Sequence, residues 1–180
     1  MLGVQEDPTN DRIRHYYARE LYFKGRYKES IEQFKIHLSL PSAQWKEERS
    51  ASYKYIAKCF RLMGEVGPEA HLEAFRAILE WPHTREPFVE LAQMSYLLRD
   101  WKTCFWAAGK ALEITHYIAT HMVESDNWGY LPHDLYSIAA WNLGFKELSL
   151  EHAVIALNYN PEDERLQSNV KVITDLINTT

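Results

Sequence analysis

Glycine and proline are scarce in this sequence, with seven of each among 180 residues. Ordinary proteins use both more often, and so few turn-forming residues exclude a many-stranded sandwich or barrel. The two cysteines, Cys59 and Cys104, are too few for a disulfide framework, which indicates a reducing, cytoplasmic setting. The scarcity of chain-breaking residues predicts long helices.

Long apolar runs and an excess of basic charge are also missing. No stretch approaches the roughly 18 apolar residues of a membrane span, and residues 1–7 lack the basic and apolar regions of a signal peptide. The chain has 20 basic and 25 acidic residues, a net charge of -5, which does not favour binding to nucleic acid. We therefore expect neither a membrane nor a nucleic acid as partner. The hydrophobic content of 46% is sufficient for the core of a single domain over residues 1–180.

Apolar residues recur at helical spacing, and the pattern itself repeats along the chain. A small residue lies in the middle of the first helix of each of four predicted hairpins, and the position seven residues later is glycine in three of the four cases. Prolines end three of the helices that follow, at Pro41, Pro82 and Pro161. The small residues are Ala18, Ala57, Ala92 and Ser137, and the turn residues are Gly25, Gly64, Arg99 and Gly144.

This pattern resembles the tetratricopeptide (TPR) repeat, whose period is roughly 34 residues. Ala57 and Ala92 are 35 positions apart (92 − 57). The resemblance implies an all-α, TPR-like α-solenoid of about four antiparallel helical hairpins plus a C-terminal capping helix. The expected repeats span approximately residues 11–41, 46–82, 85–116 and 132–160, with an irregular insertion at 117–131 and the capping helix at 161–178.

The second helix of each hairpin shows two further recurring positions, at which Phe34 and Phe75 are expected to fill the wider gaps between hairpins. One set of positions lies in the middle of these helices and a second set lies four residues further on, so that both sets share one helix face. The first set is Phe34, Phe75, Ala108 and Ala153, and the second set is Leu38, Leu79, Leu112 and Leu157.

In TPR arrays the first helices line a groove, so the residues around each small position are candidate binding groups. Residues 1–60 carry 11 basic and 8 acidic side chains (+3), which leaves 9 basic and 17 acidic (-8) for residues 61–180. We expect such a groove to hold an extended anionic segment, with arginine as a bidentate partner of carboxylate or phosphate. The alternative is an ordinary solvated helix face. The candidates are His15, Arg19, Tyr22, Lys54, Lys58, Arg61, Gln93, Tyr96, Asp134 and Trp141.

The insertion adds a second group of candidates. Trp128, His133 and Asp134 lie close in sequence to Trp141, and aromatic rings beside polar groups are typical of peptide or glycan recognition. The alternative is that Trp128 simply fills the space that the irregular segment leaves. His116 and His121 do not have the spacing of a zinc motif, and both cysteines are expected to be buried small hydrophobes. The sequence therefore predicts no metal site and no cofactor.

Several strings resemble the TPR region found C-terminal to family 2 glycosyltransferase domains of bacteria and phages. They are residues 17–21 (YAREL), 85–87 (REP), 128–129 (WG), 132–135 (PHDL), 139–144 (AAWNLG) and 160–166 (NPEDERL). The resemblance implies a module encoded with, or once attached to, a sugar-transferring enzyme. The sequence contains no Asp-x-Asp motif for a nucleotide sugar, so we expect no catalysis by this chain alone.

The leading interpretation is thus a TPR-type scaffold associated with glycosyl transfer, which binds a protein partner or positions an acceptor. The partner would be a protein or peptide, including a glycosyltransferase domain, or else a glycan or other anionic segment. One alternative is a glycosyltransferase, or a fragment of one, by kinship. A second alternative is a general protein–protein adaptor.

Overall fold

The computed structural model describes residue 7, residues 9–117, residue 120 and residues 122–179. Within this part of the chain the regular elements are helices, and no strand occurs. The chain divides into two compact units, residues 1–82 (unit 1) and residues 83–180 (unit 2), which are described separately. None of the described helices is both long and apolar enough to cross a membrane.

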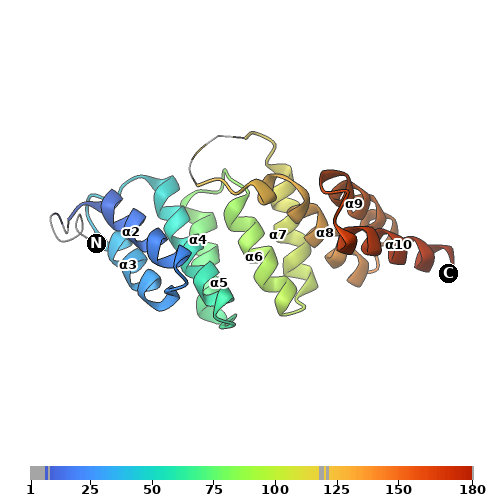
Figure 1. The fold of residues 1–180 in the computed structure, drawn as a ribbon, viewed down its shortest axis with the longest axis horizontal. Helices are drawn as coiled ribbons and strands as arrows, with labels where there is room; N and C mark the ends of the chain where they lie inside the picture. Colours follow the sequence, from blue (N-terminus) through green and yellow to red (C-terminus); the bar gives the residue numbers. More distant parts are fainter. Residues whose placement is uncertain (1–6, 8, 118–119, 121, 180) are drawn as a thin grey trace. The chain divides into compact units, whose positions relative to one another are not determined.

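Unit 1 consists of two helical hairpins (Figure 1). The first hairpin is formed by α2 (Asp11–Phe23) and α3 (Tyr27–Ser39), and the second by α4 (Lys46–Leu62) and α5 (Pro68–Glu80). Helix α3 packs against α4, so the hairpins share one core. The centre of that core contains Ala18, Ile31, Phe34, Tyr55, Ile56 and Cys59.

Unit 2 contains two further hairpins and a last helix. Its helices are α6 (Glu86–Leu97), α7 (Trp101–Glu113), α8 (Tyr130–Asn142), α9 (Lys146–Tyr159) and α10 (Glu164–Asn178). Helix α10 packs against α9 and covers its apolar side with Leu166 and Ile173, both buried. The Asp163 carboxylate begins α10 by accepting hydrogen bonds from the Arg165 and Leu166 amides. The four hairpins and the capping helix confirm the predicted all-α fold.

The predicted small residues allow the two helices of a hairpin to approach closely. Ala18, Ala57 and Ala92 are completely buried, and Ser137 is nearly so. A serine hydroxyl bridges the two helices of the first and last hairpins, since Ser30 Oγ donates to the Ala18 carbonyl and Ser137 Oγ to the Ser149 carbonyl, both at 2.8 Å. Short side chains are required here because a longer one would push the helices apart.

The hairpin turns need a left-handed residue. Gly25, Gly64 and Gly144 have φ of 72°, 76° and 86°, and Arg99 adopts φ of 56° at the corresponding position. In each case the next residue bonds back five positions, as in Arg26 N–H to the Leu21 carbonyl at 2.9 Å. This Schellman arrangement satisfies carbonyl groups that the end of a helix leaves without partners.

The prediction for the inward face of α5 is wrong by one residue. Phe75 and Leu79 are 40% and 82% exposed, whereas Ala74 is fully buried and Ile78 is 9% exposed. Phe75 lies seven residues after the start of α5, as Phe34 does after the start of α3, so α5 as a whole is rotated by about one residue relative to α3. Since one residue turns a helix by about 100°, the shift moves the expected side chains to the outer face.

Candidate functional site

The first helices of unit 1 bring three predicted binding residues together. Arg19 and Tyr22 lie on α2, and Lys58 lies on α4. The Lys58 Nζ atom lies 5.8 Å from the centre of the Tyr22 ring, and the Arg19 guanidinium carbon lies 5.8 Å from the centre of the Tyr55 ring. The Tyr22 and Tyr55 rings are themselves 5.0 Å apart. Cations and aromatic rings thus alternate across α2 and α4.

Exposed rings extend this surface along α2. Tyr16 and Phe23 are 43% and 66% exposed, and both ring centres lie 5.9 Å from the Arg19 guanidinium carbon. Contacts between a cation and a ring stabilise by about 0.5–1 kcal/mol at exposed sites, so the rings hold the Arg19 side chain in place. We call Tyr16, Arg19, Tyr22, Phe23 and Lys58 the α2–α4 surface; Arg61, also predicted, is half-buried one turn beyond Lys58.

Three of the predicted groove residues are not open to solvent, and the expectation that they line a groove is wrong. His15, Lys54 and Asp134 are 0%, 2% and 6% exposed. His15 turns from the open face of α2 toward α4, where its Nδ1 atom lies 2.8 Å from Ser52 Oγ. The neighbouring Tyr16 takes the exposed position instead.

The predicted groove residues of unit 2 do not form one cluster. Gln93 is half-buried on α6, and Tyr96 packs edge-on against Trp101, with ring centres 6.0 Å apart. Trp141 lies near the end of α8, where it lines a pocket of about 190 Å³ between α8 and α10. The other lining residues are Ile138, Asn169, Val172 and Ile173.

Trp128 anchors the segment that joins α7 to α8. It ends the short 3-10 helix η1 (Ser125–Trp128), and its indole Nε1 donates to Glu86 Oε1 at 2.9 Å. The Arg85 guanidinium lies 4.5 Å from the centre of the Trp128 ring, and Arg85 Nε donates to the Ile114 carbonyl at 2.9 Å. These contacts fix the irregular connection to the start of α6, in agreement with the space-filling alternative.

Asp134 links α8 to the capping helix. Its Oδ2 atom lies 2.9 Å from Arg165 Nη1, and its Oδ1 atom accepts from Asn169 Nδ2 at 3.3 Å. Burial raises the pKa of Asp134, and the charge of Arg165 opposes that rise. The residue therefore holds α10 in position rather than presenting a carboxylate to a ligand.

His133 also has a partner inside unit 2. Its Nδ1 atom lies 3.0 Å from Nδ1 of His152, and its ring stacks on Tyr159 at 5.9 Å. Burial, followed by the neighbouring His152, lowers the pKa of His133 to about 4. One nitrogen of the pair must donate and the other accept, so the accepting ring is neutral. The lowered pKa values of His133 and His152 keep both rings neutral near pH 7.

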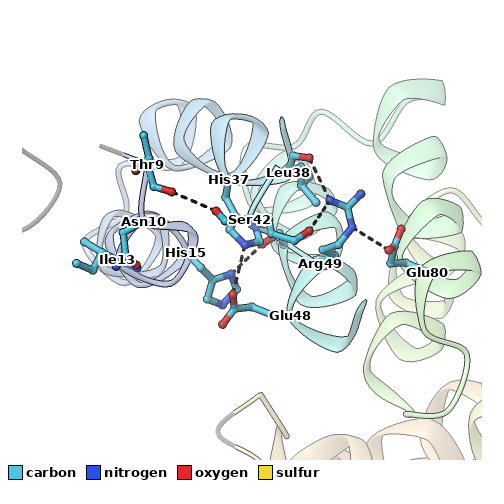
Figure 2. Close-up of polar contacts among 12 residues, drawn as sticks. Thr9, Asn10, Ile13, His15, His37, Leu38, Ser42, Glu48, Arg49 and Glu80 are labelled. Carbon is cyan, nitrogen blue, oxygen red and sulfur yellow. Dashed lines mark hydrogen bonds and ion pairs between the residues drawn. The ribbon is translucent and has the colours of Figure 1, made fainter. Parts of the chain in front are cut away.

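A second polar cluster is buried in unit 1, and sequence reasoning identified only one of its members (Figure 2). Ser52 Oγ lies 2.8 Å from Nδ1 of His15 and 2.9 Å from Nδ1 of His37. On its other side, His37 Nε2 lies 3.3 Å from Glu48 Oε1. Glu48 and Ser52 are four residues apart on α4, but the histidines come from α2 and α3, so no local spacing motif marks the cluster.

Both cysteines are buried, as the sequence predicted. The Cys104 thiol contacts the Leu135 carbonyl at 3.7 Å, and burial raises its pKa to about 12. His116 is exposed, and His121 lies outside the described residues.

Comparison with known proteins shows which fold this is. Neither a protein-family model nor a curated protein matches the sequence. Solved structures do match. YrrB, "a TPR protein with an unusual peptide-binding site", superposes with a TM-score of 0.75 at 14% identity, over 98% of this chain and 82% of that one. The type IV pilus biogenesis factor PilW has a TM-score of 0.71 at 19% identity, over 92% and 69% of the two chains.

A third solved structure, the TPR protein TTC0263 of Thermus thermophilus, has a TM-score of 0.59 at 15% identity, over 95% of this chain and 84% of that one. At these identities the likeness is one of fold. The chain therefore has the fold of TPR-repeat proteins, and its function has to be argued from its own surface.

Proposed function

We propose that this chain is a protein-interaction adaptor whose α2–α4 surface binds an extended acidic polypeptide segment. The observation that carries this proposal is the alternation of cations and rings: Arg19 lies between Tyr16, Phe23 and Tyr55, and Lys58 lies over Tyr22. An arginine held by rings loses little side-chain entropy when it pairs with a carboxylate.

The exposed rings favour a polypeptide over a small anion. Tyr16 and Phe23 offer apolar area on either side of Arg19, which suits a segment in which hydrophobic and acidic residues alternate. Large aromatic side chains with arginine are the residue types that dominate binding energy at protein interfaces. The peptide-binding site named for YrrB is consistent with this use of the fold.

The structural relatives lend no support to an association with glycosyl transfer. The insertion residues that suggested glycan recognition have structural contacts, namely Trp128 with Glu86 and Asp134 with Arg165. The general-adaptor alternative therefore fits the chain better than the enzyme-associated one.

The test is selection of a random peptide library on the full chain, followed by affinity measurement with a labelled peptide. Enrichment of acidic residues interleaved with apolar ones is the expected result. The double variant Arg19→Glu/Lys58→Glu should weaken binding at least 30-fold, because each reversal replaces an attraction with a repulsion of about 1 kcal/mol or more.

The matched control is Lys28→Glu/Lys102→Glu, which changes the net charge by the same amount at exposed positions on α3 and α7, outside the helices α2 and α4. It should bind within twofold of the unaltered chain. Equal losses of affinity in the two variants would show that net charge, and not this surface, determines binding. Selection of peptides without acidic residues would refute the proposal.

A further inference from the structure

Three side chains from three helices converge in the interior of unit 1. His15 comes from α2, His37 from α3 and Glu48 from α4. One potential ligand atom of each lies within 4.8 Å of those of the other two (Figure 2). All three side chains are at most 2% exposed. Two imidazoles and a carboxylate are a ligand set that suits zinc and related divalent ions.

The hydrogen bonds around the histidines orient them for metal binding. Ser52 Oγ contacts Nδ1 of both rings, at 2.8 and 2.9 Å. A hydroxyl oxygen can accept two hydrogen bonds, so it can accept one from each Nδ1–H group. In that tautomer both Nε2 atoms carry a lone pair. A ligating histidine commonly donates its other ring N–H to an oxygen in this way.

Glu48 supplies the charge that a cation would neutralise. Its Oε2 atom is buried and has no hydrogen-bond partner among the described residues. A buried carboxylate is costly unless it is paired or coordinates a metal. The 3.3 Å between Glu48 Oε1 and His37 Nε2 equals the separation of about 3.3–3.4 Å between two tetrahedral zinc ligands with bonds of about 2.0–2.1 Å.

We propose that His15, His37 and Glu48 bind one divalent transition-metal ion, with zinc as the preferred ion, and that Ser52 positions both histidines. The site is structural, because a buried ion joining α2, α3 and α4 adds its binding free energy to the folding of unit 1. Both oxygens of Glu48 together with the two imidazoles provide four donor atoms. The competing arrangement is a metal-free network in which the His37 Nε2–H donates to Glu48 and Ser52 Oγ–H donates to His37 Nδ1.

The experiment uses the full chain, refolded from denaturant with either zinc chloride or a chelator and then freed of excess metal. The expected result is about one zinc ion per chain, with slower amide exchange in α2, α3 and α4 of the zinc-loaded protein. His15→Gln and Glu48→Gln should each weaken zinc affinity at least 100-fold. Ser52→Ala should weaken it by about 10–100-fold through loss of the orienting hydrogen bonds.

The matched control is His152→Gln, which disrupts the half-buried His133–His152 pair of unit 2. It should bind zinc at the surviving site as the unaltered chain does. The proposal fails if this control retains no zinc at micromolar concentration, or if zinc affinity survives both His15→Gln and Glu48→Gln.

If those variants do not fold, X-ray absorption on zinc-loaded His152→Gln protein decides the matter. A shell of two imidazoles with carboxylate oxygen, together with slower exchange in α2, α3 and α4, supports the site. A sulfur ligand, or exchange changes elsewhere in the chain, overturns it.

Discussion

The residues of the two candidate sites in unit 1 differ in how far the sequence marks them. Arg19 and Lys58 were recognisable because each directly follows a small residue of the repeat, Ala18 or Ala57. The contact between His15 and Ser52 was not, because it joins residues 37 positions apart. Periodicity indicates which face of a helix is buried, but not which polar group on that face will meet a partner from another helix.

Arg99 is the one described non-glycine residue with positive φ, at 56°, and this conformation opposes folding. A left-handed backbone costs an ordinary L-residue about 1–2 kcal/mol. Glycine removes this cost, but its greater conformational freedom in the unfolded state offsets part of the gain in stability. We expect Arg99→Gly to raise the free energy of unfolding by about 0.5–1 kcal/mol, measured by urea denaturation.

The opposite substitution provides the control for Arg99. A Cβ atom at Gly144 would meet nothing within 4 Å, so Gly144→Ala tests backbone strain alone. It should lower the free energy of unfolding by about 1 kcal/mol. No gain from Arg99→Gly would mean that the arginine side chain compensates for its own strain.

At the scale of the element, the number, order and type of helices could be predicted from sequence, because the small residues and the turn glycines repeat. The register of α5 could not, since its buried residues Ala74 and Ile78 lie one position before those that correspond to Phe34 and Leu38 of α3. The sequence showed the insertion as a lapse in helical periodicity, but not how the segment is held in place. Its anchoring depends on the contact of Trp128 with Glu86, which joins residues 42 positions apart.

The register of α5 can be tested by two neighbouring truncations. Ile78→Ala removes a side chain that is 9% exposed and should cost about 2–3 kcal/mol of the free energy of unfolding. Leu79→Ala alters a side chain that is 82% exposed and should change it by less than about 0.5 kcal/mol. Urea denaturation measures both losses. A larger loss for Leu79→Ala than for Ile78→Ala would support the register that the sequence alone predicted.

In the whole molecule, each unit has its own histidine cluster, buried in unit 1 and half-buried in unit 2. Unit 1 contains His15 and His37 beside Glu48, whereas unit 2 contains the His133–His152 pair without a buried carboxylate between the rings. In unit 2, both rings of the pair are neutral, and burial opposes the addition of a proton to either ring.

The acid response of unit 2 follows from the lowered pKa of His133, about 4 against an ordinary 6.5. Between these values the unfolded chain binds more protons, so stability is complete above about pH 6.5 and declines as the pH falls toward 4. Because the ring is partly solvated, we expect a loss of about 1–2 kcal/mol rather than the full nominal shift. Amide exchange in α8 and α9 between pH 7 and pH 4.5 measures it.

The variant His133→Phe/His152→Phe is the reference for this acid response. It removes both titrating groups and should flatten the pH dependence of exchange in α8 and α9. An unchanged slope in that variant would assign the acid sensitivity to other residues.

The burial of both thiols has a practical consequence. Thiol-reactive dyes attack the thiolate, and a Cys104 pKa of about 12 leaves almost none of it at pH 7. Cysteines introduced at the exposed positions Lys28 and Lys102 would therefore be labelled ahead of the native pair. A donor and acceptor dye at these two positions would report the separation of unit 1 and unit 2 in solution as an acidic peptide is added, in a chain that keeps its own cysteines.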